Sequence, residues 1–327
     1  MKHITYGADG GADSLQLIDG PRPHPAAGQI LIEVHDAGVN RPDLRQRQGA
    51  YAPPPGASPI LGLEVAGTVA ALGADVSEWR IGDPVCALVP GGGYAEFCLT
   101  SERHALPVPT GLSLAQAAAL PEVWFTVWAN LIDLGHLRRG ERLLVHGGSS
   151  GIGLAALLLA QHLGAQALVT VGTDEKAQFC RDYGAHAAIN YRTEDFAARV
   201  LELSGAEGVD VVLDMVGAPY FERNLRVLRR DGRLVLVAFQ QGSRGELDLW
   251  PVLSKRLRIT GSTMRPRTLA EKAAIRDALA REIWPALAAE PGKTHLHAVI
   301  DWQQAADAHR LMHSSRHIGK IVLRVRA

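Results

Sequence analysis

Apolar residues follow two different patterns along the chain. Before about residue 120, short apolar runs separated by glycines and prolines predict strands at 29–34, 64–71 and 84–89. Beyond about residue 114, helical apolar stretches alternate with short runs rich in valine and leucine. We expect those later runs to be strands at 143–146, 167–171, 188–190, 209–214, 233–238 and 258–261. Their alternation with helices predicts an α/β fold with a doubly wound parallel sheet.

The C-terminal part of the chain returns to a mixed pattern. It predicts a helix at 269–289, a strand at 297–300, a second helix at 303–314 and a final strand at 320–325. We therefore expect both chain ends to form one discontinuous, mainly β domain. The expected boundaries are residues 1–121 with 265–327 for this catalytic domain, and residues 122–264 for the inserted parallel-sheet domain.

A glycine-rich turn joins the first strand of the parallel sheet to a long apolar helix. The strand at 143–146 leads into Gly-Gly-Ser-Ser-Gly-Ile-Gly, and Gly151, Gly153 and Ala156 occupy the positions of a G-x-G-x-x-A motif. Glycines allow a tight turn and close approach of a pyrophosphate, which free amides at the helix start then bind. The turn predicts a Rossmann dinucleotide-binding site that includes Ser150, Gly151, Ile152 and Gly153.

The end of the second strand of this sheet distinguishes NADH from NADPH. An acid there binds the ribose hydroxyls of NADH, whereas a cation without such an acid accommodates the 2′-phosphate of NADPH. The strand ends in Gly172, and Lys176 lies one turn into the next helix; Asp174 is close, but we expect it to face away. Taken alone, Lys176 also fits a solvated helix lysine. We expect NADPH, bound by Gly172, Thr173, Lys176 and Tyr191, with Arg192 adjacent.

The composition argues against several function classes. The 34 Lys and Arg residues balance the 34 Asp and Glu residues, so the net charge favours neither a nucleic-acid nor a membrane partner. An arginine run over 223–233 suits a solvated helix end. The three cysteines form no C-x-x-C pair, which argues against a disulfide scaffold or a cysteine-rich zinc site. The N-terminus has no apolar leader, so we expect a cytoplasmic protein.

Several segments together resemble one protein family. They include Ala-Gly-Val-Asn-Arg-Pro-Asp-Leu at 37–44, Leu-Gly-Leu-Glu-Val-Ala-Gly at 61–67, Gly-Gly-Gly-Tyr-Ala-Glu at 91–96, Pro-Glu-Val-Trp-Phe-Thr-Val-Trp at 121–128 and Ile-Gly-Lys-Ile-Val-Leu at 318–323. Over essentially its whole length the chain resembles the zinc-free quinone oxidoreductases related to ζ-crystallin, within the medium-chain dehydrogenase/reductase superfamily. The resemblance implies a GroES-like fold for the mainly β domain and a homodimer formed through the Rossmann domains. It also implies cofactor contacts by Thr126, Phe239 and Gln240.

The chain departs from the zinc-containing relatives at the positions that hold the metal. Those enzymes use a cysteine where this chain has Asn40, and a His-Glu pair where it has Leu63-Glu64. They also carry four closely spaced cysteines after a Gly-Asp-x-Val segment, whereas the segment at 82–85 here runs directly into the glycines at 91–93. No thiolates or imidazoles remain at zinc-ligand spacing, so we expect no metal.

Without a metal, the acceptor itself must stabilise the charge left by hydride addition. A quinone or an α,β-unsaturated carbonyl delocalises that charge, so the protein mainly has to position the reactants and offer hydrogen bonds. We therefore expect NADPH-dependent reduction of quinones by hydride transfer. Two alternatives stay open: an NADPH-dependent enone or alkenal reductase, and a non-catalytic NADPH-binding protein.

Three residues are candidates for contact with the substrate. Asn40 replaces the zinc cysteine and is expected to donate its amide to the substrate or the nicotinamide ribose; alternatively it caps a turn before Pro42. Tyr51 begins a proline-rich loop that, by resemblance, lies over the nicotinamide; its phenol either donates to the developing oxyanion or packs the loop. Arg265, in a Met-Arg-Pro-Arg segment, either holds the substrate oxygen or the cofactor, or is solvated.

Overall fold

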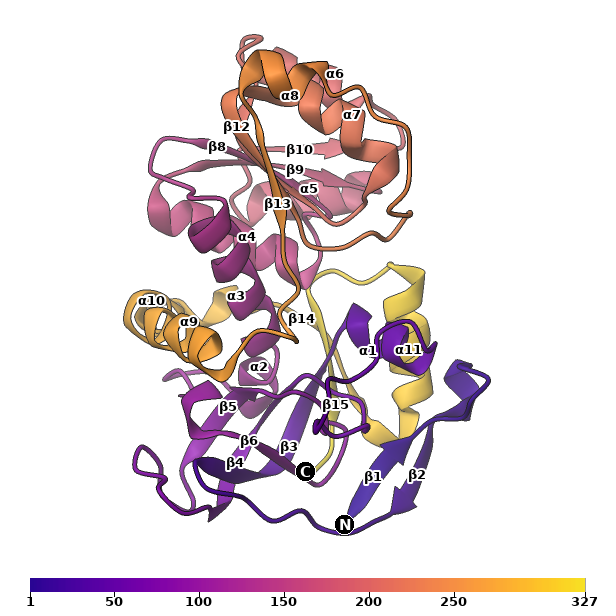
Figure 1. Ribbon diagram of the computed structural model, residues 1–327, viewed down its shortest axis with the longest axis vertical. Coiled ribbons are helices and arrows are strands. Elements are labelled where there is room, and N and C mark those ends of the chain that lie inside the picture. Colours follow the sequence, from indigo (N-terminus) through magenta and orange to yellow (C-terminus); the bar gives the residue numbers. More distant parts are fainter. Residues whose placement is uncertain (327) are drawn as a thin grey trace. The chain divides into compact units, whose positions relative to one another are not determined.

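The computed structural model describes residues 1–326, which form two compact units (Figure 1). Met1–Phe125 and Met264–Ala327 make up the first, called here the β unit, and Thr126–Thr263 make up the second, called the Rossmann unit. The division at Phe125 lies within α3 (Pro121–Val127). Within residues 1–326, no helix has the length and apolar character needed to span a lipid bilayer.

The β unit is built on a seven-stranded sheet that contains strands from both ends of the chain. The strands run in the order β14-β15-β3-β4-β5-β7, and β6 pairs with β3 off this path. Their bounds are β3 (Gln29–Val39), β4 (Glu64–Leu72), β5 (Pro84–Leu88), β6 (Phe97–Ser101), β7 (Ala105–Pro107), β14 (Leu296–Asp301) and β15 (Lys320–Arg324). A separate two-stranded sheet pairs β1 (Lys2–Thr5) with β2 (Gln16–Asp19).

The central strand β3 places the first candidate residue. It continues to Val39, beyond the expected end at residue 34, because its second half pairs with β15 on one side and β4 on the other. Val39 lies opposite Ile321, and Ala37 lies opposite both Leu323 and Val65. The chain therefore leaves β3 between the start of β15 and the start of β4, and Asn40 is the next residue.

Short helices complete the β unit. They are α1 (Arg41–Arg47), α2 (Leu114–Ala117), α9 (Leu269–Glu282), α10 (Trp284–Ala289) and α11 (Ala305–Ser314), with single turns η1 (Ala12–Ser14), η2 (Glu102–His104), η4 (Pro291–Lys293) and η5 (Trp302–Gln304). The expectation of one continuous helix at 269–289 is wrong, since the helix breaks at Ile283. Pro285 in the first turn of α10 has no backbone N–H to continue the hydrogen-bond ladder.

The Rossmann unit contains a six-stranded parallel sheet in the order β10-β9-β8-β11-β12-β13. The strands are β8 (Arg142–His146), β9 (Gln166–Val171), β10 (Ala187–Asn190), β11 (Val209–Asp214), β12 (Leu228–Leu236) and β13 (Arg258–Gly261). The helices are η3 (Trp128–Leu134), α4 (Gly151–Leu163), α5 (Asp174–Asp182), α6 (Phe196–Leu203), α7 (Ala218–Val227) and α8 (Trp250–Lys255). Figure 1 shows α4 and α5 on one side of this sheet and α6, α7 and α8 on the other, so the expected doubly wound α/β class is confirmed.

The strand order reverses beside β8. From β8 the chain moves outward through β9 to β10, and it then returns to the other side of β8 as β11. In open α/β sheets, ligands bind at the carboxyl ends of the strands where this reversal occurs. A ligand site is therefore expected at the segments that follow β8, β9, β10 and β11.

Candidate functional site

The turn after β8 leaves no room for side chains at its glycines. A Cβ on Gly153 would lie 2.3 Å from the carbonyl oxygen of Gly148 and 2.5 Å from that of Gly147. A Cβ on Gly148 would lie 2.4 Å from the Cβ of Val169 in β9, and Gly147 has a φ of +73°. The chain can pass from β8 into α4 this closely to the sheet only with glycine at these positions.

The start of α4 offers hydrogen-bond donors to an anion. Ser150 is the N-cap residue, and its Oγ accepts a hydrogen bond from Gly153 N at 3.1 Å. Within the described part of the chain, the backbone amides of Gly151 and Ile152 have no acceptor. Unpaired amides at the positive end of a 13-residue helix fit a pyrophosphate. The contacts of these four residues with a cofactor stay predictions.

Residues at the ends of β9 and β10 converge. A Cβ on Gly172 would lie 2.8 Å from Tyr191 Oη and 3.5 Å from Arg192 Nε, so both side chains lie against this glycine. Thr173 caps α5 by accepting a hydrogen bond from Lys176 N at 3.2 Å. Burial lowers the pKa of Lys176, and the nearby charge of Arg192 adds to that shift. Two cations therefore lie close together where the adenosine phosphate of a dinucleotide is expected.

Asp174 is the acid closest to this group. It lies in the first turn of α5, and its Oδ1 accepts a hydrogen bond from Asn190 Nδ2 at 2.8 Å. The carboxylate does not simply face away, as the sequence suggested, because the first turn of α5 reaches the end of the neighbouring strand β10. The hydrogen bond to Asn190 engages one of its two oxygens.

The ends of β11 and β12 also meet at this edge of the sheet. Asp214 accepts hydrogen bonds from Val216 N at 2.6 Å and Gly217 N at 3.3 Å, and burial raises its pKa to about 6. Gln240 N donates to the carbonyl of Met215, and a Cβ on Gly217 would lie 2.9 Å from the Phe239 ring. Phe239 and Gln240 therefore lie beside the turn that follows β11. Thr126 is half-buried, and its carbonyl accepts a hydrogen bond from Asn130 Nδ2 at 2.8 Å.

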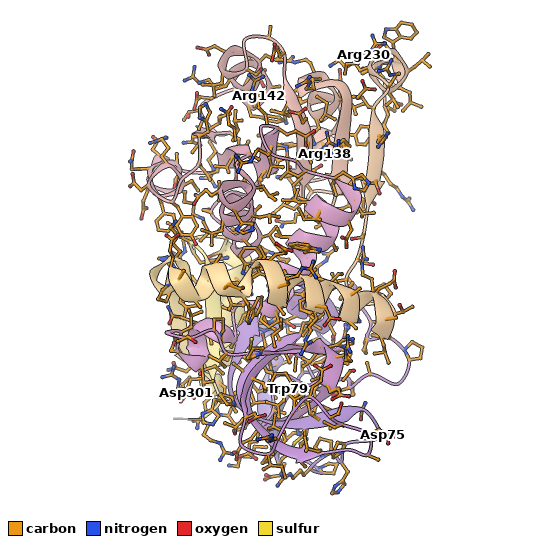
Figure 2. All side chains as sticks on the ribbon, turned by 90° about the vertical axis from the view of Figure 1, so that its left-hand side faces the viewer. Asp75, Trp79, Arg138, Arg142, Arg230 and Asp301 are labelled. Carbon is orange, nitrogen blue, oxygen red and sulfur yellow. The ribbon has the colours of Figure 1, made fainter. Side chains whose placement is uncertain are left out.

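The arginine run at 223–233 is largely engaged by acids of the Rossmann unit. Arg226 pairs with Asp195, Arg229 with Asp210, and Arg233 with Glu141 at 2.7 Å. Arg230 lies exposed at the surface (Figure 2). Arg233 is buried and also donates to the carbonyl oxygens of Gly135 and His136, so a solvated position is wrong for this residue.

In the β unit, Asn40 connects two buried charges. Its Nδ2 donates to Glu64 Oε1 at 2.8 Å, and its Oδ1 accepts from Lys320 Nζ at 2.6 Å. Lys320 Nζ also donates to Glu64 Oε1 at 2.6 Å. All three residues are less than 10% exposed, at 7% for Asn40, 0% for Glu64 and 6% for Lys320. Asn40 is the N-cap residue of α1, but its side chain forms hydrogen bonds to this ion pair. One of its two amide hydrogens is therefore already bonded within the protein.

Lys320 was not among the expected site residues. It begins β15, and the pairing of β15 with β3 brings its ammonium group to Asn40. Its Nζ also donates to the carbonyl of Val39 at 3.3 Å. The signal in the sequence is a lysine at the start of the otherwise apolar run Ile321–Leu323, which would bury a charge unless a partner were present.

Arg265 supports the loop that contains Tyr51. Its Nε and Nη2 donate to the carbonyl of Pro90 at 3.0 and 2.8 Å, and its Nη1 donates to the Tyr51 carbonyl at 3.4 Å. Its Cζ lies 5.4 Å from the centroid of the Tyr51 ring. Arg265 is only 7% exposed, so the solvated alternative is wrong. The guanidinium group fixes the backbone and ring of Tyr51, and direct contact of Arg265 with a substrate or cofactor stays a prediction.

Glu122 and Tyr51 both have raised pKa values. Burial and then the charge of Glu64 raise the pKa of Glu122 to about 8, against the opposing charge of Lys320. Burial and then the charge of Glu122 raise the pKa of Tyr51 to about 12, against the opposing charge of Arg265. At neutral pH both groups are mainly protonated. Glu122 was not expected as a site residue, and its signal is an acid within the apolar segment at 121–128.

A buried network fixes α1 next to these residues. Asp43 Oδ2 accepts from Asn40 N at 2.7 Å, and its Oδ1 accepts from Gly62 N at 3.1 Å. The Tyr94 hydroxyl lies 3.3 Å from Asp43 Oδ2 and 3.2 Å from His309 Nε2. Burial raises the pKa of Asp43 to about 6. These bonds hold Asn40 at the junction between β3 and α1.

The described side chains form no metal site. Within residues 1–326, His, Cys, Asp and Glu side chains form no group of three that could hold a metal ion. Cys86, Cys98 and Cys180 are buried thiols without disulfide bonds.

Known proteins resemble the chain along its whole length. Residues 26–110 match the alcohol dehydrogenase GroES-like domain, and residues 151–280 match the zinc-binding dehydrogenase family. The quinone oxidoreductase of Rattus norvegicus is 32% identical over 333 residues, which cover 99% of this chain and 97% of that protein. The chain belongs to the quinone oxidoreductase family. The expected membership within the medium-chain dehydrogenases/reductases, including the GroES-like fold of one part, is thereby confirmed.

Solved structures of relatives share the fold of this quinone oxidoreductase family member. The Escherichia coli quinone oxidoreductase complexed with NADPH has a TM-score of 0.85 at 29% identity, covering 99% of this chain and 100% of that chain. An NAD-dependent alcohol dehydrogenase has a TM-score of 0.87 at 29% identity, with coverage of 99% and 100%. The CurK enoyl reductase has a TM-score of 0.83 at 28% identity, with coverage of 99% and 98%. Because the named activities differ, the fold alone does not select the substrate.

Proposed function

We propose that this protein reduces quinones with NADPH and needs no metal ion. NADPH, when bound, supplies a hydride. The observation that carries the proposal is the ammonium group of Lys320, held by Asn40 and Glu64 at 2.6 Å from each. Zinc-containing relatives have a cysteine at the position of Asn40. In this chain the side chains of Asn40 and Glu64 instead bind the ammonium group of Lys320. A substrate that delocalises its own negative charge suits a site without a Lewis acid.

The cofactor assignment rests on the ends of β9 and β10 in the Rossmann unit. Tyr191 and Arg192 lie against Gly172, and the charges of Lys176 and Arg192 affect each other. A 2′-phosphate is a dianionic acceptor that such a pair of cations stabilises. The Escherichia coli relative was solved with NADPH, which supports the same choice, although another relative is named as NAD-dependent.

In the β unit we propose that Tyr51 donates a hydrogen bond or a proton to the reduced substrate oxygen. Its phenol holds its proton at neutral pH because burial, together with the charge that Glu122 carries at higher pH, raises its pKa to about 12. Arg265 fixes the Tyr51 backbone through its carbonyl, so the ring is held by the fold rather than by the substrate. Asn40 positions Lys320 and Glu64, and its second amide hydrogen is the one left for a ligand.

An enone or alkenal reductase is the second candidate. The CurK enoyl reductase has the same fold, and enal reduction needs the same hydride donor and proton donor. A non-catalytic NADPH-binding protein is the third possibility. NADPH oxidation with a panel of simple quinones and enals separates these three functions. The two reductases differ in which acceptor they turn over, whereas a non-catalytic protein would bind NADPH tightly and turn over neither acceptor.

We further propose that the protein is a homodimer formed through the edge of the Rossmann sheet. β13 is the edge strand, and the neighbouring segment exposes Leu249, Trp250 and Leu253 to 60%, 66% and 71%. An unpaired edge beside exposed apolar side chains suits a second copy of the chain. Analytical ultracentrifugation of Leu253→Asp tests this, since the variant should sediment as a monomer. A cytoplasmic location stays a prediction.

Cofactor binding gives the most direct test of the nucleotide assignment. Fluorescence titrations with NADPH and NADH should be made on the wild type, on Lys176→Ala and on Lys293→Ala, a half-buried lysine of the β unit. We expect Lys176→Ala to weaken NADPH binding by at least about tenfold and to leave NADH unchanged, because a charged hydrogen bond is lost. Equal affinities of the wild type for both cofactors would overturn the assignment.

A further inference from the structure

A buried chain of hydrogen bonds crosses the Rossmann unit next to the glycine turn. Its central residue is His146, the last residue of β8, whose Nδ1 lies 2.9 Å from Thr170 Oγ1 in β9. On the other side of the ring, His146 Nε2 lies 2.7 Å from Asn224 Oδ1 in α7. Asn224 Nδ2 in turn donates to Asp214 Oδ2 at 3.1 Å, at the end of β11. His146, Asn224 and Asp214 are 0% exposed, and Thr170 is 1% exposed.

Asp214 sets the direction of every hydrogen bond in this chain. Its pKa is raised only to about 6, so at pH 7 it is mainly a carboxylate, which accepts hydrogen bonds and donates none. Asn224 therefore turns its NH₂ group towards Asp214, and its carbonyl oxygen accepts a hydrogen bond from His146 Nε2–H. Burial lowers the pKa of His146 to about 4, so the ring is neutral at pH 7. Its Nδ1 then accepts a hydrogen bond from the Thr170 hydroxyl.

One end of the chain holds the glycine turn. The Thr170 carbonyl accepts hydrogen bonds from Gly147 N at 3.1 Å and from Gly148 N at 3.0 Å. Thr170 therefore bonds the imidazole through its side chain and the turn through its backbone. His146 directly precedes the same turn, so both residues fix where the turn begins.

The other end of the chain holds the turn after β11. Asp214 Oδ1 accepts a hydrogen bond from Gly217 N at 3.3 Å and a shorter one, at 2.6 Å, from the backbone N of the preceding residue. Backbone hydrogen bonds then join residues 215–218 to the segment 239–242, and Gln240 N is one of their donors. The chain therefore connects the glycine turn with the segment that contains Gln240, an expected cofactor contact.

Two aromatic rings hold the imidazole of His146 in place. The ring centroids of Phe196 and Tyr220 both lie 4.9 Å from the His146 centroid, at interplanar angles of 75° and 77°. These edge-to-face contacts fix the orientation of the imidazole. Its two nitrogens therefore stay aligned with Thr170 and Asn224.

We propose that His146 and Asn224 are positioning residues for the dinucleotide, which hold the glycine turn and the segment 239–242 in their binding geometry before the cofactor arrives. This inference rests on the proposed cofactor contacts at these two places. A site that is already ordered loses less free energy to ordering when its ligand binds. Loss of the chain should therefore weaken NADPH and NADH by the same factor, because neither end of the chain contacts the group that distinguishes the 2′-phosphate.

A matched pair of substitutions at His146 tests this role. His146→Leu leaves Asn224 Oδ1 and the Thr170 hydroxyl without their partner. We expect it to raise the dissociation constants of NADPH and NADH alike by about fivefold or more, the effect of losing one buried hydrogen bond. His146→Gln keeps one donor and one acceptor and should restore most of the affinity. Lys176→Ala, in contrast, should change the ratio of the two constants.

Ser204→Ala separates the positioning role from a general loss of stability. Ser204 is also buried in the Rossmann unit, and its Oγ accepts a hydrogen bond from Gly208 N at 2.9 Å. Gly208 directly precedes β11, so this bond lies at the amino end of the strand, opposite the edge that binds ligands. Ser204→Ala should lower the melting temperature and leave both dissociation constants unchanged.

Two NMR measurements on the unliganded protein need no cofactor. Nitrogen-15 spectra at pH 7 should show His146 protonated at Nε2 and unprotonated at Nδ1, with its signals identified by their absence from His146→Gln. Amide hydrogen exchange at Gly147 and Gly217 should become faster at both turns in His146→Leu and stay as in the wild type in Ser204→Ala. If His146→Leu does not fold, Thr170→Val removes a single hydroxyl from the chain and should show the same effects at a smaller size.

Three results would overturn the inference. They are wild-type dissociation constants for both cofactors in a folded His146→Leu or Thr170→Val protein, an equal weakening in Ser204→Ala, and the opposite tautomer of His146. A wild type that binds neither cofactor would instead contradict the proposed cofactor site. The NMR measurements distinguish the two failures, because they report the chain of hydrogen bonds in the unliganded protein.

Discussion

Lys320 Nζ lies 2.6 Å from Glu64 Oε1 in the interior of the β unit. The two residues are far apart in the sequence, and β15 and β4 bring them together on opposite sides of β3. Asn40 bonds both of them, so three side chains share one buried positive and one buried negative charge. Burial of such a pair is tolerated only while both partners are present.

Removal of one partner should therefore destabilise the protein strongly. We expect Lys320→Met to lower the free energy of unfolding by about 3–5 kcal/mol, because it leaves the Glu64 carboxylate buried without a cation. The double variant Lys320→Met with Glu64→Gln should recover much of this loss. Urea denaturation of the wild type and the two variants measures it. A Lys320→Met protein as stable as the wild type would show that the pair is not required.

The glycine turn gives a prediction with a matched control. In Gly153→Ala the new Cβ would meet the Gly148 carbonyl oxygen at 2.3 Å, so the turn must shift. We expect a loss of about 1–3 kcal/mol in stability and a clear loss of NADPH affinity. Gly292→Ala is the control, since a Cβ there meets nothing within 4 Å. Cofactor titration and thermal unfolding test both variants, and unchanged NADPH binding in Gly153→Ala would contradict the proposed phosphate site.

The Rossmann unit was the more predictable part of the protein. Its strands are short apolar runs between helices, and each is stabilised mainly by local βαβ packing. The pattern in the sequence is therefore sufficient to predict these strands. The glycine turn was also predictable, because the steric limit at Gly153 involves the backbone of the same turn. The positions of the ends of β9 and β10 could be predicted from the same periodicity. The structure adds that Tyr191 and Arg192 both lie against Gly172.

The charged cluster of the β unit could not be derived from local patterns. Asn40, Glu64 and Lys320 lie in three separate segments, and only the pairing of β15 with β3 and of β3 with β4 brings them together. A single acid or lysine in an apolar run indicates a buried charge but not its partner. The role expected for Asn40 was incomplete for the same reason, since the residue that its Oδ1 binds lies at the other end of the chain.

Tyr51 tests the proposed proton donor directly. Tyr51→Phe removes the phenol hydroxyl and leaves the ring that stacks near Arg265. We expect kcat with an enal to fall by about 10²–10⁴, the usual contribution of a general acid, and kcat with a quinone to fall less, because a quinone stabilises its own charge. NADPH affinity should not change. Steady-state kinetics with both substrates test this, and unchanged turnover of both would rule out the donor role.

His146 predicts how stability depends on pH. Its Nε2 lies 2.7 Å from Asn224 Oδ1 and its Nδ1 lies 2.9 Å from Thr170 Oγ1, and burial lowers its pKa to about 4. The folded protein therefore binds this proton less readily than the unfolded chain, whose histidines titrate near 6.5. The contribution to stability is present above pH 6.5 and is lost as the pH falls towards 4, with a slope of up to about 1.4 kcal/mol per pH unit.

The comparison with His146→Gln isolates this group. Asp43 and Asp214 have pKa values raised to about 6 and so act in the opposite direction, because protonation at low pH favours the folded state. Both are present in the wild type and the variant, so their effects cancel in the difference. Chemical denaturation between pH 4 and 7 should show a shallower loss of stability in His146→Gln. An identical slope in both proteins would mean that His146 does not titrate in this way.

Reduction of a quinone by NADPH without a metal is the proposed activity. Its most direct test is the rate of NADPH oxidation with a simple quinone, measured on protein treated with a strong chelator and shown by elemental analysis to contain no zinc. We predict steady multiple turnover at the same rate before and after chelation. NADPH binding without turnover, or turnover that disappears with the metal and returns with added zinc, would contradict the account.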